Sequence, residues 1–141
     1  MVKPRERGFA CESSLARALA ASIADDLRAA IRLRGCASVV VSGGSTPKPM
    51  FECLKRLDVG WDEVYLTLAD ERWVETSSVQ SNQHMVCTTL LTGAASRASF
   101  VGLKTQHIEP EDAVEECAMV LDELPSPYDV VVLGMGEDGH T

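Results

Sequence analysis

The stretch "ASVVVSGGSTPKPMF", residues 37–51, decides the fold class. Its first part, Ala37–Val41, is short, rich in β-branched residues and apolar on both faces, as expected of a strand buried in a parallel sheet. The turn "SGGSTP" leads directly into a helical pattern that begins at Pro47 and runs to about Leu57, with Thr46 as the expected N-cap. A buried strand followed by a helix is the unit from which doubly wound sheets are built.

The rest of the chain continues this alternation. A helix is predicted over Glu12–Arg34 and is expected to stop at Gly35. Its expected inward face is Leu15, Leu19, Ile23, Leu27 and Ile31. Further strands are predicted at Val64–Asp70, Ser99–Leu103 and Tyr128–Gly134, and further helices at Ser81–Leu91 and Pro110–Leu124. The predicted fold is a doubly wound, mostly parallel α/β sheet flanked by helices, a Rossmann-like three-layer arrangement.

The expected domain organisation is one α/β domain over residues 1–141, preceded by a flexible tail over residues 1–11. A sheet of this kind that ends on a strand needs a covering helix after it. We therefore expect the C-terminal part of the domain to be missing from the chain.

Composition narrows the classes of partner. The net charge of −8 argues against nucleic acid or an anionic membrane surface, since both need a basic footprint. The N-terminus lacks the apolar core of a secretion signal. The five scattered cysteines have no C-x-x-C spacing, which predicts a reduced, cytoplasmic protein without disulfides or a metal site.

Three polar segments follow predicted strands: Ser42–Thr46, Asp70–Trp73 and Gly134–Thr141. Open α/β sheets bind ligands at the carboxyl edge of their strands. We therefore expect the three segments to meet in one pocket, although they lie far apart in the sequence.

The first segment has the features of a phosphate-binding loop. Gly43 and Gly44 allow the backbone to approach an anion closely, and the amides of Gly44, Ser45 and Thr46 are predicted to point at phosphate oxygens. The spacing is not that of a P-loop. Taken alone, the segment is equally consistent with a tight turn that binds nothing.

The second segment places a carboxylate and a guanidinium side by side. Arg72 is suited to grip a phosphate or an oxyanion with two hydrogen bonds, and Asp70 to orient it or a sugar hydroxyl. Considered alone, the pattern favours a solvated salt bridge of Arg72 with Glu71 or Asp62. Trp73 is expected to pack, and Ser81-Asn82 to cap a helix.

The third segment, "GMGEDGHT", contains a candidate general base. Histidine is the side chain whose ordinary pKa lies closest to neutrality, and Asp138 is near enough to orient His140. The segment also satisfies G-x-G-x-x-G, the dinucleotide fingerprint, but it lies late in the chain instead of after the first strand. A glycine-rich surface turn is the third interpretation. Hydrolysis by an activated water suits these residues better than a covalent mechanism does, and a metal site has little support, because His84 and His107 stand alone.

Together the three segments, in this order, resemble those of the 6-phosphogluconolactonase family, whose members carry S-G-G-S-T-P, D-E-R-W-V with a downstream S-N, and G-M-G-x-D-G-H-T. The resemblance covers the front part of a typical member. It implies hydrolysis of 6-phospho-glucono-1,5-lactone to 6-phosphogluconate in the pentose phosphate pathway, by a monomer or weak oligomer whose only ligand is the sugar-phosphate lactone.

The resemblance also implies residue roles. His140 resembles the general base that activates water, and Asp138 is its orienting group. Arg72 resembles the arginine that binds phosphate or stabilises the oxyanion, with Asp70 as the neighbouring carboxylate. The implied phosphate-binding residues are Gly43, Gly44, Ser45, Thr46 and Arg72.

Three alternatives stay open. Glucosamine-6-phosphate isomerase/deaminase shares the Gly-Ser-Thr-Pro loop and a D-G-H segment, but Arg72-Trp73 and Thr141 favour the lactonase. A non-catalytic sugar-phosphate sensor of the same fold has no need of His140. An inactive fragment of a lactonase is the third alternative.

Overall fold

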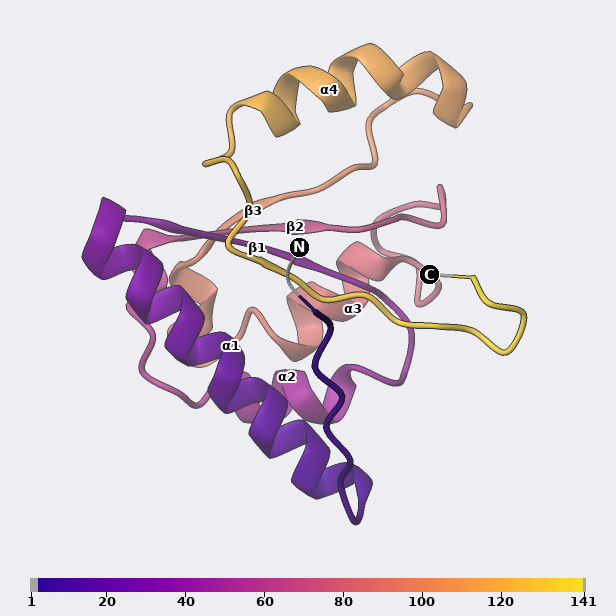
Figure 1. Ribbon diagram of the computed structural model, residues 1–141. Helices are drawn as coiled ribbons and strands as arrows, with labels where there is room; N and C mark the ends of the chain where they lie inside the picture. The colour runs from indigo at the N-terminus through magenta and orange to yellow at the C-terminus, as the bar shows by residue number, and fades with distance from the viewer. Residues whose placement is uncertain (1–2, 141) are drawn as a thin grey trace.

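The computed structural model describes residues 3–140 and contains a four-stranded, wholly parallel sheet in the order β3-β2-β1-β4 (Figure 1). Its strands are β1 (Ala37–Val41), β2 (Val64–Leu68), β3 (Ser99–Val101) and β4 (Val130–Val131). Its α-helices are α1 (Glu12–Arg34), α2 (Lys48–Leu54), α3 (Asn82–Thr89) and α4 (Val114–Asp122). The prediction of a parallel sheet flanked by helices is confirmed.

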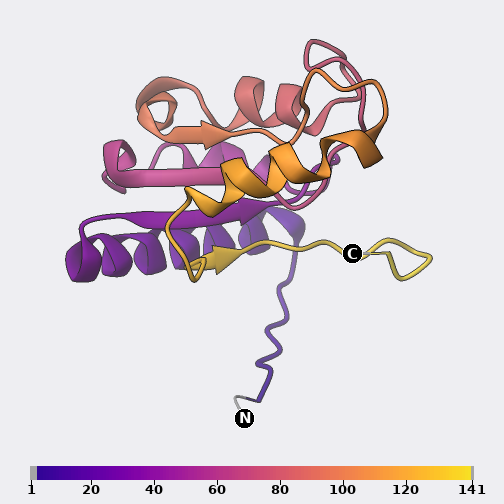
Figure 2. The same ribbon diagram turned by 90° about the horizontal axis from the view of Figure 1, so that it is seen from above.

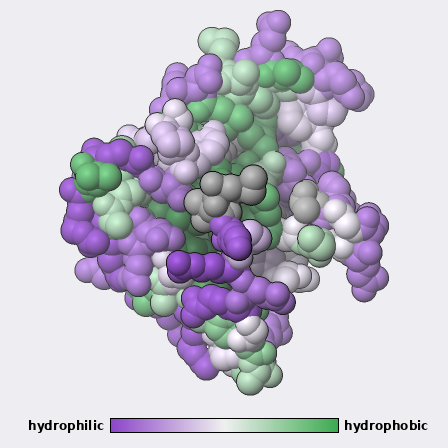
Figure 3. Space-filling model, viewed as in Figure 1, coloured by the Kyte–Doolittle hydropathy of each residue, from purple (hydrophilic) through white to green (hydrophobic). Residues whose placement is uncertain are grey.

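Helices α1, α2 and α3 lie on one face of the sheet and α4 lies on the other (Figures 1 and 2). The core lies on the first face, where side chains such as Leu27, Phe51 and Trp61 are fully buried against β1 and β2. Each large apolar side chain buried in this way contributes about 1.5–3 kcal/mol. Helix α4 has no buried residue, and apolar surface is visible between it and the rest of the molecule (Figure 3). The three-helix face is therefore the stable part of the scaffold.

Strand β1 is the centre of the sheet and is buried along its whole length, as predicted. Helix α1 also has its predicted bounds, because Gly35 adopts the left-handed conformation (φ 81°) that ends a helix. Its predicted inward face is only partly right. Ile23 and Leu27 are buried, but Leu15 is 42% and Leu19 37% exposed. A line of residues spaced four apart drifts by about 40° at each step, since a helix turns about 100° per residue.

The structure corrects two further predictions about element ends. Thr46 is not an N-cap: Pro47 holds that position and no side chain caps α2. The last strand, predicted over Tyr128–Gly134, pairs with β1 only at β4. Its entrance is fixed by Asp129, whose carboxylate accepts a hydrogen bond from the Ser38 amide at 2.8 Å and forms an ion pair with Arg34.

The described tail residues, 3–11, form neither a helix nor a strand and are exposed. Within residues 3–140, no helix combines the length and the apolar character that a membrane span requires.

Candidate active site

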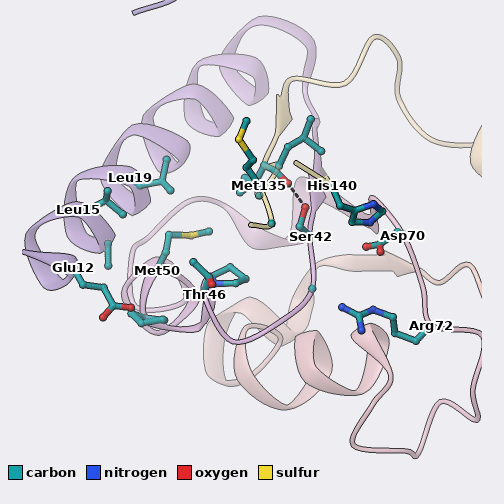
Figure 4. A pocket seen from close by; sticks show the side chains of 18 residues that line it. Glu12, Leu15, Leu19, Ser42, Thr46, Met50, Asp70, Arg72, Met135 and His140 are labelled. Carbon is teal, nitrogen blue, oxygen red and sulfur yellow. Dashed lines mark hydrogen bonds between the residues drawn. The ribbon is translucent and has the colours of Figure 1, made fainter. Parts of the chain in front are cut away.

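The three polar segments meet in one open cavity of about 610 Å³ at the carboxyl edge of the sheet (Figure 4). The first segment contributes Ser42, Gly43 and Thr46, the second Asp70 and Arg72, and the third Gly134, Gly136 and His140. The side chains of His140, Asp70 and Arg72 all line this cavity and are labelled in Figure 4. Residues nearly 100 positions apart are therefore presented to the same ligand-sized space.

The opposite wall of this cavity is apolar. Leu15 and Leu19 of α1, Met50 of α2 and Met135 of the last segment line it. This explains why Leu15 and Leu19, which were predicted to face the core, are exposed: they face the cavity instead. Ser42 holds the last segment in place, because its hydroxyl donates to the Val132 carbonyl at 2.8 Å.

A second cavity of about 470 Å³ adjoins the first, and among residues 3–140 Arg72 alone lines both. Gly44, Ser45 and Lys48 face this smaller cavity. The structure thus divides the predicted phosphate loop, with Gly43 and Thr46 on one side and Gly44 and Ser45 on the other. Lys48 was not among the predicted site residues. Its place beside Pro47, at the start of a predicted helix, gave no indication that it faces a cavity.

The salt bridge favoured for Arg72 when it is considered alone does not form. Asp62 pairs instead with Arg97 at 2.8 Å, and Glu71 accepts a hydrogen bond from the Arg72 backbone amide at 2.7 Å. Within residues 3–140, the guanidinium of Arg72 has no carboxylate partner. An unpaired guanidinium at the junction of two cavities is available to an anionic ligand.

The carboxylate of Glu71 is bound by four donors. One oxygen accepts from the amides of Arg72 (2.7 Å) and Asn82 (2.8 Å), and the other from the Gln83 amide and the Ser81 hydroxyl, both at 3.0 Å. Partial burial by itself would raise the pKa of Glu71, but these hydrogen bonds together outweigh it and lower the pKa. From the sequence, Glu71 was considered only as a salt-bridge partner, and this network was not predicted.

Asn82 joins two of the three segments. The side chain is 3% exposed and its amide nitrogen donates to the Asp70 carbonyl at 3.1 Å and to the Asp70 carboxylate at 3.2 Å. It also occupies the space beside Gly43, where a Cβ atom would lie 1.9 Å from the Asn82 side-chain oxygen. Ser81 caps α3 by accepting from the His84 amide at 3.1 Å, so the predicted cap is confirmed.

We expect Gly43→Ala to lower the free energy of unfolding by about 1–3 kcal/mol, as overpacking typically does, because the new methyl group displaces Asn82. Denaturant unfolding measures the change. Gly134→Ala is the matched control, since a Cβ there meets nothing within 4 Å. Adding Asn82→Ala to Gly43→Ala should cost less than the sum of the single effects. Equal stabilities of the two alanine variants would contradict this account.

Trp73 follows Arg72 in the left-handed conformation (φ 48°), which is unusual for a residue with a side chain. Its indole nitrogen donates to the Ile108 carbonyl at 3.0 Å, and the Lys104 ammonium lies 4.8 Å from the centre of its ring. Trp73 lines neither cavity. As predicted, its ring packs within the protein, where it fixes the chain immediately after Arg72.

The segment that carries His140 folds back on itself. The Gly136 amide donates to the His140 carbonyl at 2.7 Å, and Gly139 makes the turn with a positive φ of 82°. Asp138 accepts from the backbone amide of His140 at 3.0 Å, so it shapes the loop through the main chain. Thr141, which belongs to the predicted motif, lies outside the described residues. The role of Asp138 in orienting the imidazole stays a prediction.

Fold and site define a parallel α/β protein with a guanidinium, an imidazole and a glycine-serine-threonine loop around one cavity at the carboxyl edge of its sheet. Residues 10–141 match the model of the glucosamine-6-phosphate isomerases/6-phosphogluconolactonase family. The chain belongs to this family.

Individual relatives agree with this assignment. The chain is 47% identical over 133 residues to a 6-phosphogluconolactonase of Mesorhizobium japonicum, covering 94% of this chain and 56% of the relative. It is 46% identical over 126 residues to that of Pseudomonas aeruginosa, covering 89% and 53%. A crystal structure of a 6-phosphogluconolactonase from Shewanella baltica superposes with a TM-score of 0.92 at 48% identity, over 94% of this chain and 57% of that one. The chain thus spans about half the length of the curated relatives it matches.

Proposed function

We propose that the protein takes part in the hydrolysis of 6-phospho-glucono-1,5-lactone to 6-phosphogluconate, the lactonase step of the oxidative pentose phosphate pathway. The observation that carries the proposal is the meeting of Arg72, Asp70 and His140 in one cavity with the Ser42–Thr46 loop. The names of the relatives support the same substrate. No organic cofactor is required, since water is the only second reactant.

The charges around the two cavities indicate how the substrate lies. The smaller cavity has two cationic side chains, Lys48 and Arg72, whereas the larger one has Arg72 together with the carboxylates of Glu12 and Asp70. Because a net charge of −8 gives no long-range attraction to a phosphate, the local cations must hold it. We place the phosphate in the smaller cavity, against Gly44 and Ser45, and the lactone ring in the larger one.

In this arrangement the imidazole of His140 removes a proton from water while the water oxygen attacks the lactone carbonyl. The carbonyl oxygen gains negative charge in the tetrahedral intermediate. The bond to the ring oxygen then breaks, and His140 returns the proton to that oxygen, which becomes the hydroxyl group of the open-chain acid. Asp70 stabilises the imidazolium during the proton transfer, and Arg72 anchors the substrate.

The test is to add the lactone to protein expressed from its complete coding sequence and to follow its loss above the spontaneous rate. Catalysed loss is the expected result. Release of ammonium from glucosamine 6-phosphate would instead identify an isomerase/deaminase. Binding of 6-phosphogluconate without turnover of either substrate would identify a sensor, and would overturn the proposal.

Lys48→Met should raise KM for the phosphorylated lactone by about 2- to 5-fold and leave kcat unchanged. An exposed charge pair is worth roughly 0.2–1 kcal/mol, and Lys48 is exposed. Steady-state kinetics gives both constants. The control is Lys55→Met, just past the other end of α2 and outside both cavities. An unchanged KM would place the phosphate elsewhere.

We further propose that residues 1–141 belong to one α/β domain, of which residues 1–11 are a tail, and that the protein works in the cytoplasm as a monomer or weak oligomer. The free state of all five cysteines supports a reducing compartment.

A further inference from the structure

We propose that Glu71 is the positioning residue of this site: its carboxylate fixes Asp70 and Arg72 against helix α3 and, through Asn82, against the Gly43 turn, so that both side chains face the cavity before a ligand binds. The inference deepens the proposed function and rests on it. Glu71 lines neither cavity, so it acts through its neighbours.

The first support is the saturation of the carboxylate. Two carboxylate oxygens offer about four acceptor sites, and all four hydrogen bonds of Glu71 come from within the protein. A group with no free acceptor is not placed to bind substrate. It is placed to hold the chain that bears the binding groups.

The second support is the origin of the donors. Asn82 and Gln83 supply amides from the first turn of α3, which have no partner within their own helix. The Arg72 amide supplies the third backbone bond. One carboxylate therefore ties the loop after β2 to the start of a helix that is more than ten residues further along the chain.

The third support is the continuation of the network. Asn82, held by Glu71 through its amide, donates from its side chain to both the carbonyl and the carboxylate of Asp70. The same side chain fills the space that Gly43 leaves open. Displacing Glu71 would thus move the Asp70 carboxylate, the Arg72 guanidinium and the Gly43 turn together.

Glu71→Gln is the informative substitution, because it keeps the size of the side chain but replaces one acceptor oxygen by an NH2 group. When the NH2 group takes the place of the oxygen that faces the Ser81 hydroxyl and the Gln83 amide, it cannot accept a hydrogen bond from that amide. We expect kcat/KM for the phosphorylated lactone to fall about 10²-fold, the scale of loss that follows a displacement of about 1 Å at a reacting site. The control is Glu75→Gln, in the same loop. Glu75 is exposed and its carboxylate forms no ion pair within residues 3–140, so this variant should keep the wild-type kcat/KM.

A double-mutant cycle separates positioning from simple loss of folded protein. If Glu71 acts in part through Arg72, Glu71→Gln should lower kcat/KM by a clearly smaller factor in the Arg72→Ala background than in the wild type, because one of the groups that it positions is already gone. The same large factor in both backgrounds, matching a loss of folded protein by circular dichroism, would overturn the inference. An inactive wild-type protein would instead refute the proposed function.

The wild-type protein gives a further measurement in case Glu71→Gln does not fold. The backbone amide resonances of Arg72, Asn82 and Gln83 should shift together in an NMR pH titration, with one midpoint below the ordinary glutamate pKa of about 4.3. Asp70 and Arg72 are the charged neighbours in the same network. Separate midpoints for the three amides would show that no single carboxylate holds them, and would overturn the inference.

Discussion

Replacing His140 by alanine is expected to lower kcat for the phosphorylated lactone by about 10²–10⁴-fold, the usual contribution of a general base. KM should change little, because the cations that hold the phosphate remain. The melting temperature should also stay the same. His140 is exposed, and within residues 3–140 only its backbone makes a hydrogen bond.

His107→Ala provides the matched control for this prediction. His107 lines neither cavity, and its Nε2 lies 3.3 Å from a carboxylate oxygen of Glu116 on α4, which covers the other face of the sheet. Steady-state rates on protein expressed from the complete coding sequence should be normal for this variant. If His140→Ala kept wild-type turnover, water would be activated by another group, and Asp70 would be the first to examine since it shares the cavity.

The pH dependence of stability offers an independent check on the Glu71 network. A carboxylate whose pKa is lower in the folded than in the unfolded state stabilises the protein at pH values above the unfolded pKa. That contribution is lost as the pH falls through the folded pKa. The stability difference between wild type and Glu71→Gln should therefore be constant near neutrality and shrink below about pH 4.3.

Elements whose ends are marked by the local sequence were predicted correctly. Strand β1 was found from its sequence because all five residues are buried, so the apolar run has the same ends as the strand. Helix α1 was found because Gly35 supplies the terminating conformation. The last strand was predicted too long. It pairs with β1 only at Val130 and Val131, and Val132 is then held by two single bonds, from its amide to the Val40 carbonyl and from the Ser42 hydroxyl to its carbonyl.

The site was predictable in outline but not in its supporting contacts. Parallel strands bring their carboxyl ends to one edge, so the meeting of Ser42, Asp70 and His140 follows from the strand order. The hydrogen-bond donors to Glu71 do not follow from the strand order, because they depend on a turn that brings residues 81–83 back to the loop after β2. Spacing along the chain likewise gave no sign that Asn82 would occupy the space beside Gly43.

Arg72→Ala should remove most of the preference for a phosphorylated substrate. Two charge-assisted hydrogen bonds at about 1.5 kcal/mol each amount to roughly 3 kcal/mol. At about 1.36 kcal/mol per factor of ten, kcat/KM for 6-phospho-glucono-1,5-lactone should fall about 10²-fold. Arg72→Lys should recover only part of this loss, because an ammonium group keeps the charge but cannot form the two-pronged contact. Arg32→Ala, an exposed arginine of α1 outside both cavities, controls for the change in net charge.

Unphosphorylated glucono-1,5-lactone distinguishes the two roles that Arg72 could have. If the guanidinium binds the phosphate, Arg72→Ala should leave the slow hydrolysis of the unphosphorylated lactone unchanged, so the ratio of the two kcat/KM values falls about 10²-fold. If it stabilises the oxyanion, both substrates should lose the same factor, mainly in kcat. The position of Arg72 favours the first result, because Arg72 also lines the smaller cavity, which contains Lys48 but neither His140 nor Asp70. Equal losses for the two substrates would show that Arg72 does not bind the phosphate, and would contradict its placement in the smaller cavity.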